Sequence, residues 1–314
     1  MKIFLFILLS VLLLLLVSGG YTFFTACRRR KEHPWFSKEE LSRTSFGKYY
    51  PSIIATDVWL KEKNAREISM LSRDGLCLRA LWIGAENAIG TILLAHGYRS
   101  TFLVDFSKAF ASYHQKGLNI LVPYQRAHGK SEGRYITFGV KESDDFLQWV
   151  EYHNENLSTA PIVLSGMSMG ATTVLMLADA DLPQNVKGII ADCGFTSPKA
   201  IIGEIFHKVV HLPAWVCMWA ADLFAAIFAG FRLSEKDTRK SLANSKVPVL
   251  MVHGKADDFV PCSMTEEGYD ACIAPKKLLL VDGAGHGVSY IVAQKEYSAL
   301  IDEFLNEILS VKGE

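Results

Sequence analysis

Short apolar runs recur along the chain from Thr91 onward, and helix-forming segments separate them. The runs are "TILLAHG", "LNILVPY", "PIVLSG", "VKGIIADCG", "VPVLMVHG" and "KKLLLVDGAGH". Because their apolar residues do not alternate with polar ones, strands formed by these runs are buried on both faces. Buried strands that alternate with helices are typical of a parallel sheet covered by helices. We therefore expect an α/β fold with a mostly parallel central sheet and helices on both of its faces.

A different pattern precedes these runs. In "REISMLSRDGLCLRALWIG", apolar and polar residues alternate on both sides of Asp74-Gly75. Alternation indicates half-buried strands, and an Asp-Gly pair between two such strands is a strong hairpin signal. The sequence therefore predicts an antiparallel hairpin ahead of the parallel strands.

The segment between "ADCGFTSP" and "VPVLMVHG" interrupts the alternation with about fifty mostly apolar residues. It opens with Ser197-Pro198, a favourable helix start. A second membrane span is the alternative, because residues 214–231 carry only Asp222 as a charge. A charge in the middle of a span is costly in lipid, however, and insertions of this kind often form lids over active sites. We therefore expect residues of about 196–243 to form a helical lid, and we call them the lid segment.

The amino-terminal stretch is almost continuously apolar. Residues 3–27 contain no charged side chain, and a helix of this length, at about 1.5 Å per residue, can cross a hydrocarbon core of roughly 30 Å. A cleaved signal peptide usually has a shorter apolar region and an A-x-A-like site, which this stretch lacks. The "FTAC" that ends at Cys27 resembles a bacterial lipobox, although Phe24 fits its first position poorly. We expect an uncleaved transmembrane anchor over residues 1–27, with a cleaved signal peptide or a lipoprotein as the alternatives.

Charges on either side of this stretch indicate its orientation. Residues 28–31 read "RRRK", whereas Lys2 is the only basic side chain before it. Basic residues tend to stay on the cytoplasmic side, so the large domain is expected in the cytoplasm, with the opposite orientation as the alternative. A Ser37–Glu40 capping box predicts a short helix within a juxtamembrane segment of residues 28–65. Residues 66–314 are then expected to form one domain that includes the lid segment.

Overall composition narrows the possible partners. The 314 residues include 33 basic and 33 acidic side chains, so the net charge creates no electrostatic attraction for nucleic acid. We therefore do not expect nucleic acid as a partner.

The cysteines show no CxxC pair and no metal-ligand spacing, and their scatter fits free thiols better than a disulfide framework. They are Cys27, Cys77, Cys193, Cys217, Cys262 and Cys272.

A serine between two glycines follows the third of the apolar runs. Residues 166–170, "GMSMG", fit the G-x-S-x-G pattern of a nucleophile elbow, in which a sharp strand-to-helix turn exposes the serine hydroxyl. The strained turn requires small residues two positions before and after Ser168, and Gly166 and Gly170 meet this requirement. A glycine-rich turn that serves only structure would give the same five letters. The rest of the chain must therefore supply the other catalytic groups.

A nucleophilic serine needs a base, and the base needs an acid that orients it. In the elbow fold these follow in the order Ser, Asp or Glu, His. The strand "LMVHG" leads to Asp257, and the strand "LLLVDGAGHG" ends at His286, so both residues fall at the carboxyl edge of the sheet. Each has an ordinary explanation, a helix cap or a surface histidine, but Ser263–Glu266 already reads as the capping box of the next helix. We therefore predict a Ser168–His286–Asp257 triad.

Two other carboxylates remain open as the acid. Asp192 follows the strand "GIIA", a position where some lipases carry their acid, and Asp258 is adjacent to Asp257. For the oxyanion hole, one backbone N–H should come from Met169, directly after the nucleophile, and the other from Tyr98 in the loop "LLAHGYRS". The side chain of Tyr98 is expected to line the acyl pocket.

Taken together, these motifs resemble the α/β-hydrolase superfamily, in the branch of serine aminopeptidase-like and prolyl-oligopeptidase-like hydrolases. The resemblance covers about Arg66 to Leu309, through "SRDGLCLRALW", "LLAHGYRS", "QRAHGKSEGRYITFG", "SGMSMGA", "ADCGFTS", "VPVLMVHGKADDFVP" and "GAGHG". It implies the α/β-hydrolase fold, and its "HGxxDxxVP" spacing implies Asp257 rather than Asp258. The chain departs from the family's "RGHGxSxG" loop, since Ala127 replaces the first glycine and Tyr124 stands where an aspartate is usual. His128 in this loop is expected to be structural.

The expected activity is acyl transfer to Ser168 and then to water, on a small-molecule acyl substrate. Neither a metal nor an organic cofactor is implied. The apolar lid segment, with Trp215, Trp219, Phe224 and Phe228, favours carboxylic esters, including lipid-like acyl esters. A serine peptidase or aminopeptidase and a non-catalytic binding protein of the same fold are the alternatives.

Overall fold

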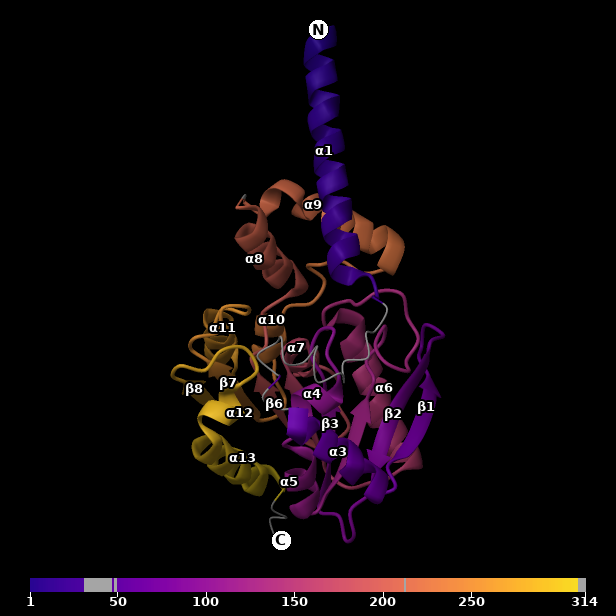
Figure 1. The fold of residues 1–314 in the computed structure, drawn as a ribbon, viewed down its shortest axis with the longest axis vertical. Helices are drawn as coiled ribbons and strands as arrows, with labels where there is room; N and C mark the ends of the chain where they lie inside the picture. Colours follow the sequence, from indigo (N-terminus) through magenta and orange to yellow (C-terminus); the bar gives the residue numbers. More distant parts are fainter. Residues whose placement is uncertain (31–46, 48–49, 212, 310–314) are drawn as a thin grey trace.

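The computed structural model describes residues 1–30, 47, 50–211 and 213–309 (Figure 1). The helix expected around Ser37–Glu40 lies outside the described residues. The fold has a central sheet covered by helices, and one long helix projects from the body.

The sheet has eight strands in the order β1-β2-β4-β3-β5-β6-β7-β8. Strands β3 to β8 run parallel to one another, whereas β2 is antiparallel to both β1 and β4. Arg66 faces Trp82 and Leu71 faces Cys77 across the first pair. The expected hairpin and mostly parallel sheet are both confirmed. The strands are β1 (Arg66–Leu71), β2 (Cys77–Ile83), β3 (Gly90–Ala95), β4 (Leu118–Pro123), β5 (Ile162–Met167), β6 (Val186–Asp192), β7 (Val249–Gly254) and β8 (Lys276–Val281).

Helices cover both faces of this sheet (Figure 1). One apolar cluster joins the sheet to α3 (Tyr50–Glu62), α4 (Phe102–Phe106), α5 (Phe110–Gln115) and α13 (Gln294–Leu309). A second cluster joins the other face to α6 (Val140–Asn156), α7 (Met169–Leu175), α10 (Thr238–Leu242) and α11 (Ser263–Ala271). Every residue of β3, β4 and β7 is buried, as their non-alternating apolar patterns predict.

The lid segment contains α8 (Pro198–Val210) and α9 (Trp215–Phe224), and α9 continues into a short π-helical turn, η2 (Ala225–Ala229). Ser197 caps α8, because its side chain accepts a hydrogen bond from the Ala200 N–H at 3.2 Å. Figure 1 shows α8 and α9 at the end of the body from which the long helix projects. They lie apart from the two helical layers that cover the sheet.

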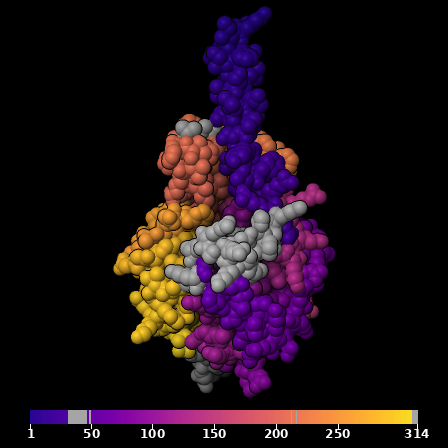
Figure 2. Space-filling model, in the orientation of Figure 1, coloured from indigo at the N-terminus to yellow at the C-terminus, as the bar shows by residue number. Residues whose placement is uncertain are grey.

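The long helix is α1 (Lys2–Cys27). Within the described part of the chain it is the only helix long and apolar enough to cross a membrane, a test that signal sequences also pass. Figure 2 shows its first turns projecting from the body. Its last turns pack against α9, and Gly19, Gly20, Phe23 and Cys27 are buried there. One long apolar helix of this kind is compatible with a single-pass anchor.

Candidate active site

Ser168 lies in a strained turn between β5 and α7. Its backbone adopts φ 55° and ψ −118°, a conformation that L-residues rarely adopt. A Cβ on Gly166 would lie 2.6 Å from the Ala171 nitrogen, and one on Gly170 would lie 2.8 Å from the His96 oxygen. Both glycines are therefore required by close backbone approach, as the elbow motif predicts. The turn places the Ser168 side chain at the carboxyl end of β5.

Three side chains from distant parts of the chain meet at this edge of the sheet. His286 follows β8, and its Nε2 lies 2.9 Å from Ser168 Oγ. Its Nδ1 lies 2.7 Å from Oδ2 of Asp257, which follows β7. A carboxylate only accepts hydrogen bonds, so Nδ1–H donates to Asp257 and Nε2 is left to accept the serine proton. The arrangement can therefore deprotonate the hydroxyl and orient the base at once.

Asp257 is held by more than His286. The backbone N–H groups of Phe259 and Val260 both donate to its Oδ1 at 2.9 Å, and the Nε2 of His253 lies 3.1 Å from its Oδ2. Burial alone would raise the pKa of this carboxyl. The hydrogen bonds from His253 and His286 and the Coulombic attraction of His286 outweigh burial and lower it well below its ordinary value. Asp257 therefore stays ionised beside the imidazole.

His253 is a positioning residue to which the sequence analysis assigns no role, although it is the first residue of the HGxxDxxVP pattern. It is the second-last residue of β7 and has a fully buried side chain, and its Nδ1 lies 2.6 Å from the Thr265 hydroxyl. This contact fixes the ring so that Nε2 faces Asp257. Two signals in the sequence could have found it: the HGxxDxxVP pattern, and a polar residue inside an apolar strand four positions before the acid. The expected capping box at Ser263 is wrong, because α11 begins at Ser263 itself and has Cys262 as its N-cap without a side-chain hydrogen bond.

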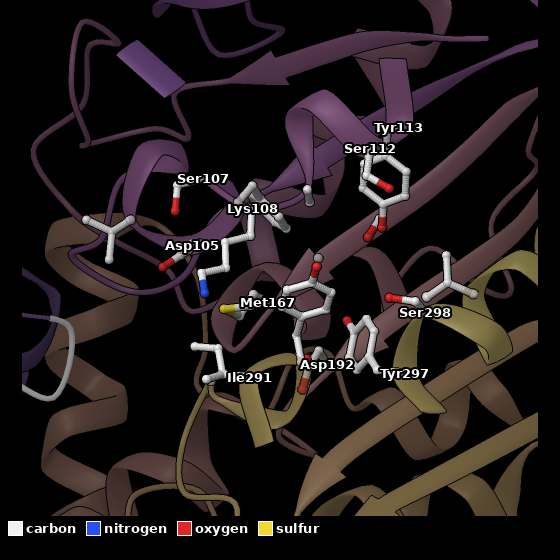
Figure 3. Close-up of a pocket in the computed structure, with 18 of the residues that line it drawn as sticks. Asp105, Ser107, Lys108, Ser112, Tyr113, Met167, Asp192, Ile291, Tyr297 and Ser298 are labelled. Carbon is white, nitrogen blue, oxygen red and sulfur yellow. The ribbon is translucent and has the colours of Figure 1, made fainter. Parts of the chain in front are cut away.

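The structure does not bring the two alternative acids to His286. Asp258 is exposed, and its backbone carbonyl accepts a hydrogen bond from Lys208. Asp192 is buried at the end of β6, where its backbone carbonyl accepts the Ser168 N–H at 2.8 Å. Burial raises the pKa of the Asp192 carboxyl to about 6. Figure 3 shows Asp192 beside a cavity that Asp105, Met167 and Tyr297 also line.

The loop after β3 approaches the nucleophile from the other side. Gly97 lies so close that a Cβ on it would be 3.4 Å from Ser168 Cβ. The backbone N–H groups of Tyr98 and Met169 donate no hydrogen bond to any residue that the structure describes. Both are thus available as donors to a developing oxyanion, which is the role that the sequence assigns to them.

Buried polar groups hold this loop in place. Asp105 accepts hydrogen bonds from the Gly97 N–H and the Ser100 hydroxyl, both at 2.6 Å, and burial raises the pKa of its carboxyl to about 6. Nε2 of His128 accepts the Arg99 N–H at 3.0 Å, so this histidine has the structural role expected of it. Sequence reasoning missed Asp105, because its contact with Gly97 depends on how a short helix packs.

The loop is also tied to the end of α1. The Tyr98 hydroxyl donates to the Ala26 carbonyl at 2.7 Å, and the Arg99 guanidinium donates to the carbonyls of Thr25 and Arg28 at 2.7 and 3.2 Å. Arg99 thus caps the carboxyl end of the helix. The Tyr98 ring also stacks on Phe138, with 5.0 Å between centroids. The Tyr98 side chain, which the sequence predicts to line an acyl pocket, joins this loop to α1. We call residues 96–101 the oxyanion loop, after the role predicted for the Tyr98 N–H.

The loop after β4, whose sequence departs from the family pattern, is held by buried contacts with other elements. Ala127, at the position of the usual glycine, has φ 61°, a conformation that glycine adopts more easily. The buried guanidinium of Arg126 donates to both oxygens of Asp145, at 2.7 and 2.6 Å, and also pairs with Asp74 at 2.8 Å. This pairing connects β4 to α6 and to the turn of the hairpin.

Cys193, Asp257 and His286 form the one group in the described part of the chain whose ligand atoms lie close enough to hold a metal ion. Both ring nitrogens of His286 already face partners, Ser168 and Asp257. Burial raises the pKa of the Cys193 thiol, which keeps it protonated. These donors fit a hydrogen-bonded triad better than a metal site. All six cysteines are free thiols, as their spacing predicts.

The comparisons with known proteins agree with this geometry. The model of the prolyl oligopeptidase family matches residues 132–312, more than half of the chain, and this range contains Ser168, Asp257 and His286. The chain belongs to the prolyl oligopeptidase family. An uncharacterized protein of Bacillus subtilis, YqkD, is 28% identical over 235 residues, which cover 74% of this chain and 77% of YqkD. An AB hydrolase superfamily protein of the same organism, YisY, is 34% identical over 107 residues, or 33% of this chain and 39% of YisY.

Solved structures share the fold of this family member. The esterase Pf2001 of Pyrococcus furiosus superimposes with a TM-score of 0.64 at 23% identity, over 80% of this chain and 96% of the esterase. Est1E of Butyrivibrio proteoclasticus, solved with ferulic acid, gives a TM-score of 0.58 at 19% identity, over 78% of this chain and 100% of Est1E. These likenesses show the α/β-hydrolase fold. Together with the family match, they make the protein a hydrolase of that fold.

Proposed function

We propose that the protein is a membrane-anchored serine hydrolase that cleaves carboxylic esters through an acyl-enzyme on Ser168. The observation that carries this proposal is the hydrogen-bonded chain from Ser168 Oγ through His286 to Asp257. His286 takes the hydroxyl proton as Ser168 attacks the ester carbonyl, and the N–H groups of Tyr98 and Met169 bind the oxyanion. His286 then returns the proton to the leaving alcohol. A water activated by the same imidazole releases the acid.

Exposed apolar side chains of the lid segment favour an acyl ester over a peptide. Trp215, Trp219 and Phe228 all present large apolar surfaces to the outside. An acyl chain gains from contact with such surfaces, whereas an amide N–H and a charged amino terminus gain nothing. The name of the family favours the second candidate, a peptidase, which would use the same catalytic groups.

Labelling with a fluorophosphonate probe tests the nucleophile. The full chain in detergent is expected to be labelled, and Ser168→Ala is expected to abolish the signal. Ser234→Ala, at an exposed serine of the lid segment, serves as the matched control and keeps the label. A signal that survives Ser168→Ala refutes the assignment. A chain that is never labelled, although it is folded by circular dichroism, favours the non-catalytic binding protein.

Substrate preference needs a second assay. Rates are compared between p-nitrophenyl esters of increasing acyl length and aminoacyl p-nitroanilides. Faster ester cleavage is expected, with kcat/KM rising with chain length as more apolar surface is buried. Faster anilide cleavage would instead identify a peptidase.

The single-pass anchor and its orientation are part of the proposal. One long apolar helix is compatible with the anchor, and the basic residues 28–31 that follow it are compatible with the proposed orientation. We expect a membrane-impermeant thiol reagent to leave the domain unlabelled in intact cells and to label it after lysis. The partly exposed Cys77 and Cys262 are suitable targets. Labelling of intact cells would reverse the orientation.

A further inference from the structure

Only part of α1 is free to cross a membrane alone. Its large apolar side chains from Ile3 to Val17 are mostly exposed, whereas Gly19, Gly20 and Phe23 are buried against other parts of the protein. At about 1.5 Å per residue, the free stretch from Ile3 to Val17 is roughly 22 Å long. A hydrocarbon core is roughly 30 Å thick, so this stretch falls short by about 8 Å.

The missing length lies where α1 contacts α9. A span of about 20 residues that begins at Ile3 ends near Thr22, beyond the first contact with the lid segment. Thinning the bilayer by about 8 Å to match this stretch has a free-energy cost that grows with each ångström of mismatch. Immersing α9 beside α1 avoids that cost if the surface of α9 is apolar. The surface of α9 therefore decides whether the bilayer thins around α1 or α9 enters the lipid beside it.

The exposed face of α9 and η2 is almost entirely apolar. Its exposed large side chains are Trp215, Trp219, Leu223 and Ile227, with exposed fractions between 39% and 77%. Trp215 and Trp219 also border a hollow that charged side chains such as Lys199, Glu204 and Lys236 line. Asp222, the one charge in this stretch, is paired, because Arg232 donates to its carboxylate at 2.7 Å and the Leu233 N–H donates at 2.7 Å. Tryptophan is also enriched where a membrane meets water.

Close packing makes α1 and α9 a single unit. A Cβ on Gly19 would lie 2.7 Å from the Ala221 nitrogen, and one on Gly20 would lie 3.0 Å from the Phe224 ring. Small residues that let helices approach closely are typical of helix pairs in membranes. The Phe23 ring also lies within 6.5 Å of Phe224 and 6.3 Å of Phe228, centroid to centroid. An inserted α1 therefore carries α9 with it to the bilayer surface.

We propose that the lid segment is a membrane-docking surface, with the exposed face of α9 and η2 seated in the lipid beside α1. This inference rests on the anchor in the proposed function. The lipid completes the span that α1 alone leaves short and covers apolar side chains that water would otherwise contact. Because Arg99 and Tyr98 join the end of α1 to the oxyanion loop, the depth of α1 also fixes how far Ser168 lies from the bilayer. A lipid-like ester then reaches the serine from the membrane.

Fluorescence quenching by lipid tests the docking surface. The full chain is reconstituted into phosphatidylcholine vesicles with or without brominated acyl chains, in a Trp35→Phe background because Trp35 lies outside the described residues. We expect brominated lipid to quench the tryptophan emission. Trp215→Phe/Trp219→Phe should remove more than half of that quenching, whereas the matched control Trp59→Phe/Trp82→Phe should keep it. Quenching that is the same in both pairs overturns the proposal.

Flotation of the same vesicles separates the two possible failures. A chain that floats but whose lid tryptophans are not quenched keeps its anchor and loses the docking surface. A chain that does not float refutes the anchor and the docking surface together. A dimer in detergent whose lid tryptophans are not quenched in vesicles assigns the face to a second copy, which also overturns the proposal.

A charge on the docking surface gives a functional readout. Ile227→Glu, at a side chain that is 65% exposed, is expected to raise the apparent KM for an ester held in vesicles roughly tenfold, which corresponds to about 1.4 kcal/mol. Its kcat on soluble p-nitrophenyl acetate should stay within twofold. Ile273→Glu, at a side chain that is 72% exposed and lies outside the lid segment, is the matched control and should change neither value. Equal effects of the two substitutions on the vesicle substrate refute the inference.

Discussion

The buried carboxyl of Asp192 makes a prediction about stability that can be worked out in numbers. It lies behind the catalytic serine, at the end of β6, and burial raises its pKa from 3.8 to about 6. A raised carboxyl pKa means that the fold disfavours the ionised form. Asp192 is therefore least costly to the fold at acid pH and most costly once the pH exceeds its folded pKa. Asp192→Asn removes that charge with almost no change of shape.

The expected size follows from the two pKa values. The interval of 2.2 pH units between 3.8 and about 6 corresponds to about 3 kcal/mol at about 1.36 kcal/mol per unit. At pH 5 about half of this penalty is already present, because the unfolded chain is ionised there and the folded chain mostly is not. The other half, on the order of 1 kcal/mol, develops between pH 5 and pH 8.

Urea unfolding of the full chain in detergent, followed by tryptophan fluorescence, measures this difference. Between pH 5 and pH 8, the free energy of unfolding of Asp192→Asn should rise by an amount on the order of 1 kcal/mol relative to the unsubstituted protein. Asp181→Asn, at a side chain that is fully exposed, should show no such pH dependence. A difference that stays constant with pH, or falls as pH rises, would show that the Asp192 carboxyl does not pay the desolvation penalty assigned to it.

Three further substitutions test the support of the site. His253→Phe should lower kcat on a soluble ester roughly tenfold to a hundredfold with little change in KM, because a hydrogen bond to a charged group such as Asp257 is worth about 1.5–3 kcal/mol. Gly170→Ala should abolish fluorophosphonate labelling and lower the melting temperature, because overpacking costs about 1–3 kcal/mol. Arg126→Met should lower the free energy of unfolding in urea by about 3–5 kcal/mol, since it leaves Asp145 buried without its cation.

Each of these substitutions has a control that distinguishes the loss of one specific contact from a general disruption of the fold. His253→Gln keeps an N–H donor and should restore part of the lost kcat, and a loss equal to that of His253→Phe argues against a positioning role. Gly75→Ala adds the same methyl group where nothing lies within 4 Å, so it should leave labelling intact. Arg73→Met breaks an exposed pair with Glu151 and should cost about 1 kcal/mol or less. A similar loss for the exposed and buried arginines would contradict the assignment of Arg126.

The strands were predictable because each carries its own signal. Strands buried on both faces need unbroken apolar runs, and the six runs from Thr91 onward correspond to β3 through β8. The order of the site residues was also readable, since the carboxyl ends of parallel strands meet at one edge of a sheet. Ser168, Asp257 and His286 could therefore be placed together from local patterns alone, and the structure brings them within hydrogen-bond distance.

The residues that support the site could not be found in this way. Asp105 acts through a contact with Gly97 that depends on how α4 packs, and no local pattern encodes that distance. His253 opens the HGxxDxxVP pattern, but the pattern does not state that its ring faces Asp257. The contact between α1 and α9 is of the same kind, because an apolar helix reads alike whether lipid or protein covers it. The misplaced cap at Ser263 has a local cause. The pattern Ser-x-x-Glu fits a helix whether the serine precedes its first turn or belongs to it.

The carbonyls at the end of α1 bear on the maturation of the protein. Proteolytic removal of the leader after residue 26 would take away the oxygens of Thr25 and Ala26, which are acceptors for Arg99 and Tyr98. A processed form would retain the serine, the histidine and the aspartate but would leave the oxyanion loop without part of its scaffold. Full-length and trimmed chains should therefore differ in turnover even on a water-soluble substrate. The amino-terminal helix would then contribute to activity as well as to targeting, because its last carbonyls hold Tyr98 and Arg99 in place.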